Sequence, residues 1–417
     1  MIPVAKPNLG EEEAAAIREV ILSGWIAQGP KVKAFEEAFA AYSGCRYACA
    51  VSNCTTALHL ALLVLGVKPG DVVITVSHSF IATANSIRYC GAEPVFVDID
   101  PATYNISPEG LERLFREDCE LIDGKLFYKQ ALRLLTGESP LRALSKDAVP
   151  RLGRVAAVLM VHQMGMPCDL GRVLPLARAW NLPVIEDAAC AIGSETRWED
   201  DGPWEKIGRP HGDLACFSFH PRKILTTAEG GMITTSNPAY DRKLRLLRHQ
   251  GMSVSDLIRH QSQSVIVEEY PVVGYNYRLT DIQAALGLAQ LKKLPQMILR
   301  RRDLAAAYQR ELRGIGWVEL PQEPPYARTN WQSFPVRVRE DAPLNRNELM
   351  QSLLDAGIST RPGIMNAHQE EPYQPQRWHL PHSEKARQET ILLPLFDAMN
   401  EEDFYKVIHH LKGCLVK

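Results

Sequence analysis

Between about residues 45 and 235, the sequence alternates between short apolar runs rich in β-branched residues and longer stretches of helical character. The runs are apolar throughout rather than alternating in polarity, as expected for strands that are buried on both faces. This alternation predicts an α/β fold with a mostly parallel central sheet between layers of helices. The predicted strands are "DVVITV" (71–76), "PVFVDI" (94–99), "VAAVLMV" (155–161), "LPVIED" (182–187), "LACFSF" (214–219) and "GMITT" (231–235).

At 417 residues, the chain exceeds the usual size of a single hydrophobic core. We therefore predict a large domain over residues 31–280 and a smaller α+β domain over residues 281–417, which includes a connecting helix. We expect residues 1–30 to pack with the small domain. Residues 117–152 carry mixed charges and a helical piece of their own, so they are predicted to form an insertion in the large domain.

The long helical pattern after Thr280 contains Pro295, where we expect an interruption because proline removes a backbone hydrogen bond.

The composition excludes several classes of partner. The 47 Lys and Arg residues balance 49 Asp and Glu residues, which gives no reason to expect nucleic acid or an anionic membrane as a partner. The sequence contains no apolar window of membrane-spanning length and does not begin with a signal peptide. The nine cysteines are odd in number and lack metal-binding spacing. We therefore expect a cytoplasmic protein with reduced cysteines and no metal site.

Ligands of parallel sheets bind beyond the carboxyl ends of the strands, so the residues there are candidate site residues. In "VSNCTTALHLALL" (51–63), a strand end and a turn of small residues lead into a helix. Free N–H groups at Thr55, Thr56 and Ala57, together with the helix dipole, could bind a phosphate group. The alternative is an ordinary helix cap.

Two charged residues stand at the ends of other predicted strands. Asp187 lies in "PVIEDAACAIG" (183–193), where an apolar environment requires a cationic or hydrogen-bonded partner, or protonation. It could also be a helix cap or part of a buried ion pair.

Lys223 lies in "FSFHPRKILTTAEGG" (217–231), between two apolar strands. Burial would favour its neutral, nucleophilic form. The alternative is an exposed loop lysine.

A phosphate-binding helix end, a buried aspartate and a strand-end lysine are together the groups that pyridoxal 5′-phosphate (PLP) requires. The lysine forms a Schiff base with the aldehyde, and the aspartate keeps the pyridine nitrogen protonated. The three segments therefore predict a PLP-dependent enzyme.

Beyond these features, six segments resemble the DegT/DnrJ/StrS family of nucleotide-sugar aminotransferases, which are PLP enzymes of fold type I, like aspartate aminotransferase. The resemblance covers nearly the whole chain except residues 117–152 and 196–210. The segments are "GWIAQGPKVKAFEEAFAAY" (24–42), "SNCTTALHLAL" (52–62), "FIATANSIRYCGAEPVFVDIDPATYNI" (80–106), "IEDAACAIGSE" (185–195), "FSFHPRKILTTAEGG" (217–231) and "GYNYRLTDIQAALGLAQLKKL" (274–294).

The resemblance assigns roles to individual residues. It implies that Lys223 is the catalytic Schiff-base lysine and that Asp187 binds the pyridine nitrogen. It also implies that Thr55, Thr56 and Ser218 bind the phosphate of the cofactor.

Four further residues complete the expected cofactor site. Phe80 matches an aromatic residue that stacks on the ring, and His162 matches a histidine near the cofactor. Cys190 stands near the phenolic oxygen, where the family usually carries Gln or His. Asn276 matches an asparagine that reaches the phosphate in the neighbouring subunit, which implies a homodimer with shared active sites.

The activity implied is an amino transfer from L-glutamate, through pyridoxamine phosphate, to a keto-sugar. The expected acceptor is a nucleotide-linked 4-keto-6-deoxyhexose or a 3-keto sugar, in the biosynthesis of deoxyamino sugars such as those of lipopolysaccharide. Arg361, His368 and Tyr373 are candidate contacts to this acceptor, or else surface loop residues. The insertion could be a lid, a dimer extension or a wall of the acceptor pocket.

Several alternatives remain. Related sugar 3-dehydratases carry histidine in place of Lys223, which argues against that activity. Aminotransferases of cyclitol ketones and synthases of aminobenzoate-type precursors share these motifs. A non-catalytic, PLP-binding regulator is the alternative from another class. An NAD-binding Rossmann enzyme is rejected, because no strand is followed by GxGxxG.

Overall fold

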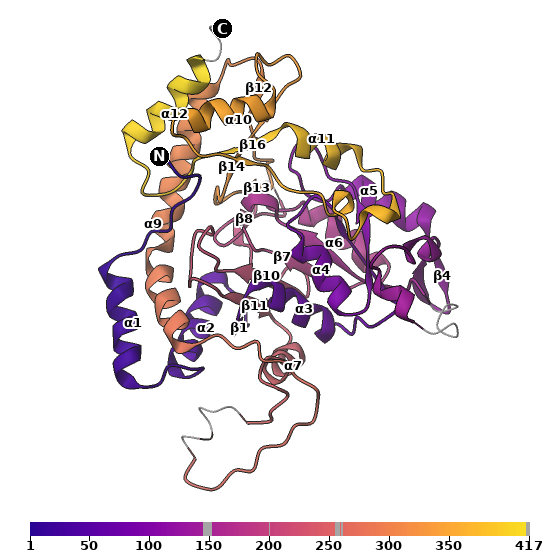
Figure 1. The fold of residues 1–417 in the computed structure, drawn as a ribbon. Coiled ribbons are helices and arrows are strands. Elements are labelled where there is room, and N and C mark those ends of the chain that lie inside the picture. The colour runs from indigo at the N-terminus through magenta and orange to yellow at the C-terminus, as the bar shows by residue number, and fades with distance from the viewer. Residues whose placement is uncertain (145–151, 200, 255–258, 260–261, 414–417) are drawn as a thin grey trace.

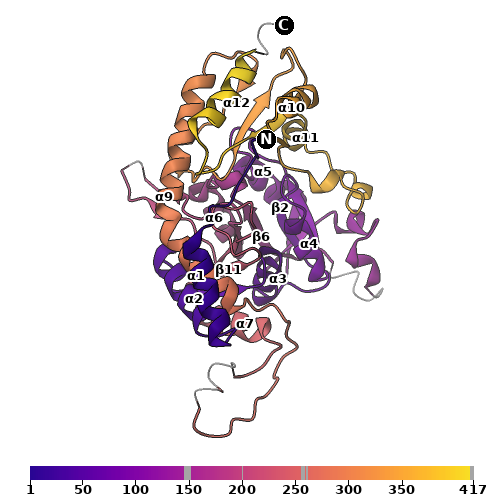
Figure 2. The same ribbon diagram turned by 60° about the vertical axis from the view of Figure 1, so that its left-hand side comes forward.

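The computed structural model describes residues 1–144, 152–199, 201–254, 259 and 262–413. Its central element is a seven-stranded sheet between helices (Figures 1 and 2), which confirms the predicted α/β class. β11 runs antiparallel to both of its neighbours, and all other neighbouring strands are parallel. In spatial order, the strands are β1 (Tyr47–Val51), β11 (Gly231–Thr235), β10 (Leu214–Ser218), β7 (Val184–Asp187), β6 (Val155–Val161), β2 (Val72–Val76) and β3 (Glu93–Val97).

Helices cover both sides of this sheet (Figures 1 and 2). On one side, Phe35 and Phe39 of α2 contact the rings of Phe217 and Phe219, at centroid separations of 5.1 to 5.7 Å. Such aromatic packing buries large apolar areas and fixes the helix on the sheet. The helices of this part of the chain are α1 (Glu11–Ser23), α2 (Pro30–Ser43), α3 (Cys54–Val64), α4 (Ala82–Tyr89), α5 (Pro108–Arg113), α6 (Leu170–Ala179) and α7 (Pro238–Arg248).

A second hydrophobic cluster lies around an antiparallel sheet in the C-terminal part of the chain. The first residues of the chain join it: the Ile2 N–H donates to the Gly357 carbonyl at 2.8 Å, and Ile2 is 4% exposed. The sheet is formed by β12 (Val318–Glu319), β14 (Phe334–Val338), β16 (Thr390–Leu393) and β15 (Arg361–Pro362), and its helices are α10 (Arg346–Asp355) and α12 (Glu401–Gly413).

One long helix, α9 (Asp281–Leu312), runs along the molecule and contributes to both hydrophobic clusters (Figure 1). Its first residue binds α2, because the Asp281 carboxylate accepts from the N–H groups of Gly29, Lys31 and Val32 at 2.8 to 3.0 Å. The expected interruption at Pro295 does not occur. Proline removes one hydrogen bond, but the packing of the helix on both clusters outweighs that local cost.

A short π-helix, η1 (Leu114–Asp118), leads into the insertion, which continues with a hairpin of β4 (Cys119–Ile122) and β5 (Lys125–Tyr128). Two short 3₁₀ turns follow, η2 (Ala131–Leu134) and η3 (Pro140–Ala143); residues 145–151 lie outside the described residues.

The insertion packs against the C-terminal part of the chain. The Arg133 guanidinium lies 4.1 Å from the ring centroid of Trp378, and Ser139 donates to the buried Glu93 carboxylate at 2.8 Å. Gln376 donates to the same carboxylate at 2.7 Å. The insertion is thereby attached to the segment around residues 372–378.

Smaller elements complete the described chain. The remaining strands, β8 (Glu195–Thr196), β9 (Glu205–Lys206) and β13 (Ala327–Arg328), form a three-stranded sheet. The remaining helix, α11 (Pro381–Glu389), and the 3₁₀ turns η5 (Gln163–Gly165), η6 (Ala367–Gln369) and η7 (Gln374–Gln376) lie between strands.

A long segment between α7 and α9 projects away from the rest of the molecule (Figures 1 and 2). We call the described residues of 249–280 the arm. The arm exposes large apolar side chains: Val265 is 96% exposed, Val273 89% and Val267 82%. Apolar side chains gathered on a projecting segment are typical of surfaces that bind another protein.

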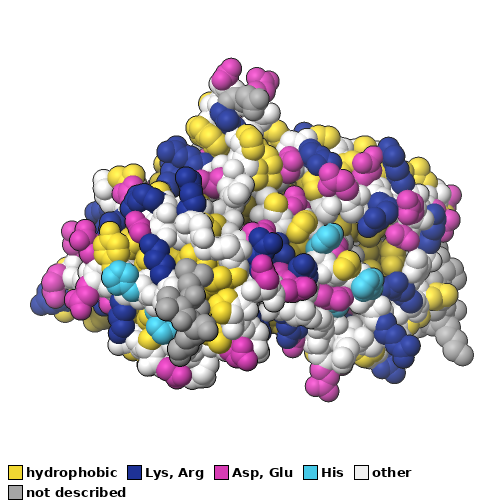
Figure 3. All heavy atoms as spheres, turned by 90° about the horizontal axis from the view of Figure 1, so that it is seen from above, with side chains coloured by type: hydrophobic (Ala, Val, Ile, Leu, Met, Phe, Trp, Pro, Cys, Tyr) yellow, Lys and Arg dark blue, Asp and Glu magenta, His cyan; other side chains and the backbone are white. Residues whose placement is uncertain are grey.

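Acidic and basic side chains are interspersed on the face of the molecule shown in Figure 3. Within the described residues, no helix combines the length and the apolar character needed to cross a membrane. The same part of the chain contains no group of three or more His, Cys, Asp or Glu side chains placed to hold a metal ion.

A buried ion pair connects α2, β1 and α7, and it provides a test of the fold. The Glu36 carboxylate accepts from Arg245 at 2.7 Å, from the Ala50 N–H at 2.8 Å, and from Arg248. Burial alone would raise the pKa of Glu36, but the two guanidinium groups hold it below its ordinary value of 4.5. This carboxylate therefore stabilises the fold above pH 4.5, and the contribution is lost as the pH falls through the lowered pKa.

We predict that Glu36→Gln lowers the free energy of unfolding at pH 7 by about 3 to 5 kcal/mol, because it leaves the buried Arg248 guanidinium without its counter-charge. Denaturant titration from pH 7 to pH 3 measures this difference, which should shrink below pH 4.5 as the wild-type carboxyl becomes protonated. Glu37→Gln is the matched control: that side chain is exposed, so its removal should change stability by about 0.5 kcal/mol or less. Equal effects of the two substitutions would contradict this account.

Candidate active site

The turn between β1 and α3 forms a capped helix N-terminus. The Asn53 side chain accepts from the Thr56 N–H at 2.9 Å, and the Thr56 hydroxyl donates to the Asn53 carbonyl at 2.8 Å. The Ala57 N–H, expected to be free, instead bonds to the Asn53 carbonyl at 3.1 Å. The Thr55 hydroxyl forms no hydrogen bond with the described residues. Thr55 is therefore the better placed of the two threonines to contact a ligand.

The backbone at the end of the neighbouring strands lies very close to this cap. A side chain added at Gly231 would come within 2.5 Å of the Asn53 carbonyl oxygen, so only glycine fits there. Gly231 pairs with Ser218 at the carboxyl end of β10, and the Ser218 hydroxyl accepts from the His220 N–H at 3.4 Å. The helix N-terminus and the Ser218 hydroxyl thus lie on adjoining elements, as a phosphate site requires.

Asp187 ends β7 and is only 4% exposed. Its carboxylate accepts from the Thr83 hydroxyl at 2.9 Å and from the Ala189 N–H at 3.2 Å. It forms no ion pair within the described residues, so neither a helix cap nor a buried salt bridge accounts for it. Burial raises the pKa of Asp187, although the Thr83 hydrogen bond acts against this. A buried carboxylate of this kind fits a cationic ring nitrogen as its missing partner.

Lys223 directs its amine into the site. Its Nζ donates to the Cys190 thiol at 3.0 Å, and it lies close enough to Asp187 for their charges to interact. Burial acts to lower the pKa of Lys223, but Cys190, Cys54 and Asp187 outweigh it and raise the pKa above its ordinary value. Burial favours the neutral amine, as expected, but these neighbours outweigh burial and favour the ammonium form.

The backbone around Lys223 is fixed by its own loop. The Lys223 N–H donates to the His220 carbonyl at 2.8 Å, and the Thr226 hydroxyl donates to the Phe219 carbonyl at 2.8 Å. On the opposite side, the buried Asn330 amide donates to the Cys190 carbonyl at 2.9 Å. The amine and the thiol are therefore held at a defined separation by two independent loops.

Phe80 begins the turn that carries Thr83, whose N–H donates to the Phe80 carbonyl at 3.0 Å. The Phe80 ring is 63% exposed, which is unusual for a large aromatic side chain beside a buried carboxylate. An exposed ring in this position can stack on a planar ligand bound at Asp187.

His162 is completely buried beneath the site, and both of its ring nitrogens have partners. Its Nε2 lies 3.0 Å from the Glu186 carboxylate, and its Nδ1 accepts from the Cys168 N–H at 3.0 Å. This pattern fixes the neutral Nε2–H tautomer. A bound cofactor could therefore contact only the face of the His162 ring, because both ring nitrogens already have hydrogen-bond partners.

The arm carries Asn276, whose side chain is exposed and forms no hydrogen bond within the described residues. The structure does not bring this side chain together with the other predicted site residues of the same chain.

The three candidate acceptor residues lie in different environments. His368 is buried and bonds through Nδ1 to the Ser77 hydroxyl at 2.7 Å. Tyr373 is buried and donates to Asn85 at 2.8 Å. His368 thus holds its segment against the end of β2, and Tyr373 holds it against α4, so neither is a surface loop residue. Arg361 is exposed and available for an anionic ligand.

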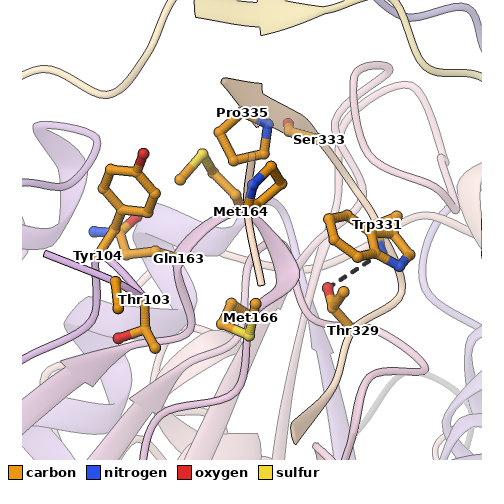
Figure 4. Close-up of a pocket in the computed structure, with 11 residues that line it drawn as sticks. Thr103, Tyr104, Gln163, Met164, Met166, Thr329, Trp331, Ser333 and Pro335 are labelled. Carbon is orange, nitrogen blue, oxygen red and sulfur yellow. Dashed lines mark hydrogen bonds between the residues drawn. The ribbon is translucent and has the colours of Figure 1, made fainter. Parts of the chain in front are cut away.

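A small pocket lies apart from these residues (Figure 4). Tyr104 and Gln163 line one side and Trp331 the other, with Met164 between them. Its volume of 20 Å³ admits a water molecule but not a substrate. The pocket contains none of the predicted site residues.

Sequence reasoning missed Thr83, which binds the Asp187 carboxylate. The only available signal was its position three residues after Phe80, at the start of a predicted helix, and many helix starts carry a threonine in that position.

A lysine and an aspartate at neighbouring strand ends, beside a helix N-terminus, are the groups that a PLP-dependent enzyme of fold type I requires. The sequence matches the DegT/DnrJ/EryC1/StrS aminotransferase family over residues 7–122 and 144–412, and the chain belongs to this family. The unmatched residues 123–143 lie within the insertion.

Individual relatives match along the whole chain. GDP-perosamine synthase of Caulobacter vibrioides is 36% identical, with 100% of this chain and 98% of the relative covered. The crystal structure of the aminotransferase TlmJ from Streptoalloteichus hindustanus is 31% identical with a TM-score of 0.80, covering 100% of this chain and 99% of that one. The sugar aminotransferase CalS13 from Micromonospora echinospora is 26% identical with a TM-score of 0.79, covering 99% and 100%.

The Thr83 hydroxyl can be tested as a support of Asp187. We predict that Thr83→Val raises the pKa of Asp187 further, because it removes a hydrogen bond to the carboxylate. A hydrogen bond to a charged group contributes about 1.5 to 3 kcal/mol, so PLP affinity should fall by about 10-fold to 100-fold. Spectroscopic titration of the purified protein with PLP measures this change. Thr83→Ser retains the hydroxyl and should bind PLP as the wild type does; equal losses in both variants would contradict the role.

Proposed function

We propose that this protein is a PLP-dependent aminotransferase that moves the amino group of L-glutamate to the keto group of a nucleotide-linked sugar. The observation that carries the proposal is the buried Asp187 carboxylate, which forms no ion pair within the described residues and lies beside the Lys223 amine. A protonated pyridine nitrogen is the cation that this carboxylate fits.

The residues present can hold PLP as a set. Asp187 would pair with the ring nitrogen, and Phe80 would cover one face of the ring. Thr55, the N-terminus of α3 and Ser218 would bind the phosphate, with Thr56 holding the helix cap in shape. Cys190 would lie beside the edge of the ring, next to Lys223. When bound, PLP supplies an aldehyde that condenses with amines and a ring that withdraws electrons from the attached carbon.

The protein's own residues would then move the proton. With PLP and glutamate bound, the Lys223 amine would remove a proton from the substrate carbon and return it as a general acid. Asp187 would hold the protonated ring nitrogen. Thr83 and the Ala189 N–H hold the Asp187 carboxylate in place. The same residues act in reverse order when the keto-sugar receives the amine.

The sugar class rests on the relatives. GDP-perosamine synthase and the sugar aminotransferase CalS13 are similar along nearly the whole chain. A nucleotide-linked 4-keto-6-deoxyhexose, or a 3-keto sugar, is the acceptor that we propose, in deoxyamino-sugar and lipopolysaccharide biosynthesis. Arg361 and Arg222 are exposed and could contact the nucleotide phosphates.

We further propose that the enzyme is a homodimer with shared active sites. The arm carries exposed valines together with the exposed Asn276, which makes no contact with the other site residues of its own chain. A partner subunit would cover the valines and receive Asn276 at its cofactor phosphate.

The activity is tested by incubating purified enzyme and PLP with L-glutamate and a panel of keto-sugar nucleotides. Mass spectrometry should detect an amino-sugar nucleotide together with 2-oxoglutarate. Lys223→Ala should lose at least about 10³-fold in rate, because general acid–base catalysis alone contributes about 10² to 10⁴-fold. Lys129→Ala is the control: that amine donates to the Glu117 carbonyl at the surface, so the rate should stay unchanged.

The panel also separates the alternatives. Amination of a cyclitol ketone with no keto-sugar accepted would overturn the substrate class but not the chemistry. Binding of PLP without conversion of glutamate would indicate a regulator and overturn the activity.

Shared active sites are tested by mixing two inactive variants. Lys223→Ala lacks the amine, and Asn276→Ala lacks the proposed contact to the partner's cofactor. In a mixed dimer, one site combines an intact Lys223 with an intact Asn276 from the other chain. We therefore expect co-refolded equal mixtures to recover about a quarter of wild-type activity, because about half of the dimers are mixed and each of these has one intact site of two. Mixtures that stay as inactive as the separate variants would contradict shared sites.

A further inference from the structure

The contact between Lys223 and Cys190 joins two reactive groups. The Nζ and Sγ atoms lie 3.0 Å apart, and each belongs to a loop whose backbone is fixed by hydrogen bonds. Most cysteines in the described part of the chain are buried; Cys190 and Cys45 are the two that solvent reaches in part. A small oxidant can therefore reach the Cys190 thiol, and the Lys223 amine lies next to that thiol.

We propose that hydrogen peroxide converts this pair into a covalent, reversible sulfur–nitrogen bridge that inactivates the lysine. Peroxide first oxidises the Cys190 thiol by two electrons to a sulfenic acid and is itself reduced to water. The Lys223 ammonium releases one proton to the solvent, and the neutral nitrogen then attacks the sulfur; the hydroxyl leaves with a second nitrogen proton as a second water. The product is a sulfenamide between Cys190 and Lys223. Two equivalents of an external thiol reduce it and restore both side chains.

The geometry favours this product over other fates of the sulfur. Sulfenic acids react with the nearest nucleophile, and nitrogen nucleophiles give sulfenamides. The nearest nucleophile here is the Lys223 amine, which already donates to the sulfur. Cys54 is also close enough to interact electrostatically with Cys190, but it is only 8% exposed and has no hydrogen bond to that sulfur. Burial raises the pKa of Cys54 well above its ordinary value, so it stays a weakly reactive thiol.

The bridge would block the residue on which the proposed activity depends. A thiol at position 190 makes this chain sensitive to oxidation, whereas a serine hydroxyl there would not be oxidised by peroxide. Bound PLP would protect the pair, because it occupies the lysine. Oxidation would thus act on protein that has not yet acquired its cofactor.

The test uses full-length protein freed of cofactor and treated with hydrogen peroxide. Peptide mass spectrometry should find the peptides of Cys190 and Lys223 joined and lighter by two hydrogen atoms, and dithiothreitol should separate them. Cys190→Ser should give no joined peptides. Cys45→Ser is the matched control, because the Cys45 thiol contacts Ser43 and Tyr47 and not an amine; its protein should form the bridge as the wild type does.

A second measurement uses the wild-type protein alone, so that misfolding of a variant cannot affect the result. Wild-type protein whose thiols are alkylated before the peroxide step should give no bridge. Two results would overturn the inference: oxygen added to Cys190 with the Lys223 peptide unlinked, or a disulfide between Cys190 and Cys54. The bridge is measured on the protein without PLP, so it does not depend on the proposed function. Protection by added PLP is a separate readout that tests the cofactor.

Discussion

The active site of this protein depends on one buried charge. Asp187 lies at the end of a strand inside the sheet, with a hydroxyl and an N–H group as its partners and no ion pair in the described chain. Burying a carboxylate without a counter-charge is costly, so the surrounding structure must hold it there. Thr83 comes from α4, and Lys223 comes from the loop that follows β10. The segment from Asn366 to Tyr373 forms hydrogen bonds on both sides of Thr83, with Ser77 and His78 before it and with Asn85 after it.

The fold could be predicted largely from the periodicity of the sequence. The strands Val155–Val161 and Gly231–Thr235 have the bounds that their apolar runs indicate, because both faces of a central strand are buried. Pro295 misled the prediction: a proline breaks an isolated helix, but α9 packs on two hydrophobic clusters that compensate for the lost bond. Packing of this kind is not visible in a local sequence window.

The active site could be predicted only in part, because some of its contacts also depend on packing that a local sequence window does not show. Strand ends converge in a parallel sheet, so Asp187, Lys223 and the start of α3 could be grouped from sequence position alone. The contacts of His368 and Tyr373 join segments nearly 300 residues apart, and the contact of Thr83 with Asp187 joins segments 104 residues apart. The spacing of residues in the sequence does not encode such contacts. The sign of the pKa change at Lys223 likewise depends on the thiol of Cys190 and could not be derived from burial alone.

The unbroken α9 also has a thermodynamic consequence. Its side chains belong to both hydrophobic clusters, and the buried Arg301 donates to carbonyls of Trp331 and Leu395 in the C-terminal part. Loss of either cluster would leave half of the helix without its packing surface. The two parts of the chain should therefore melt together, in one calorimetric transition rather than two.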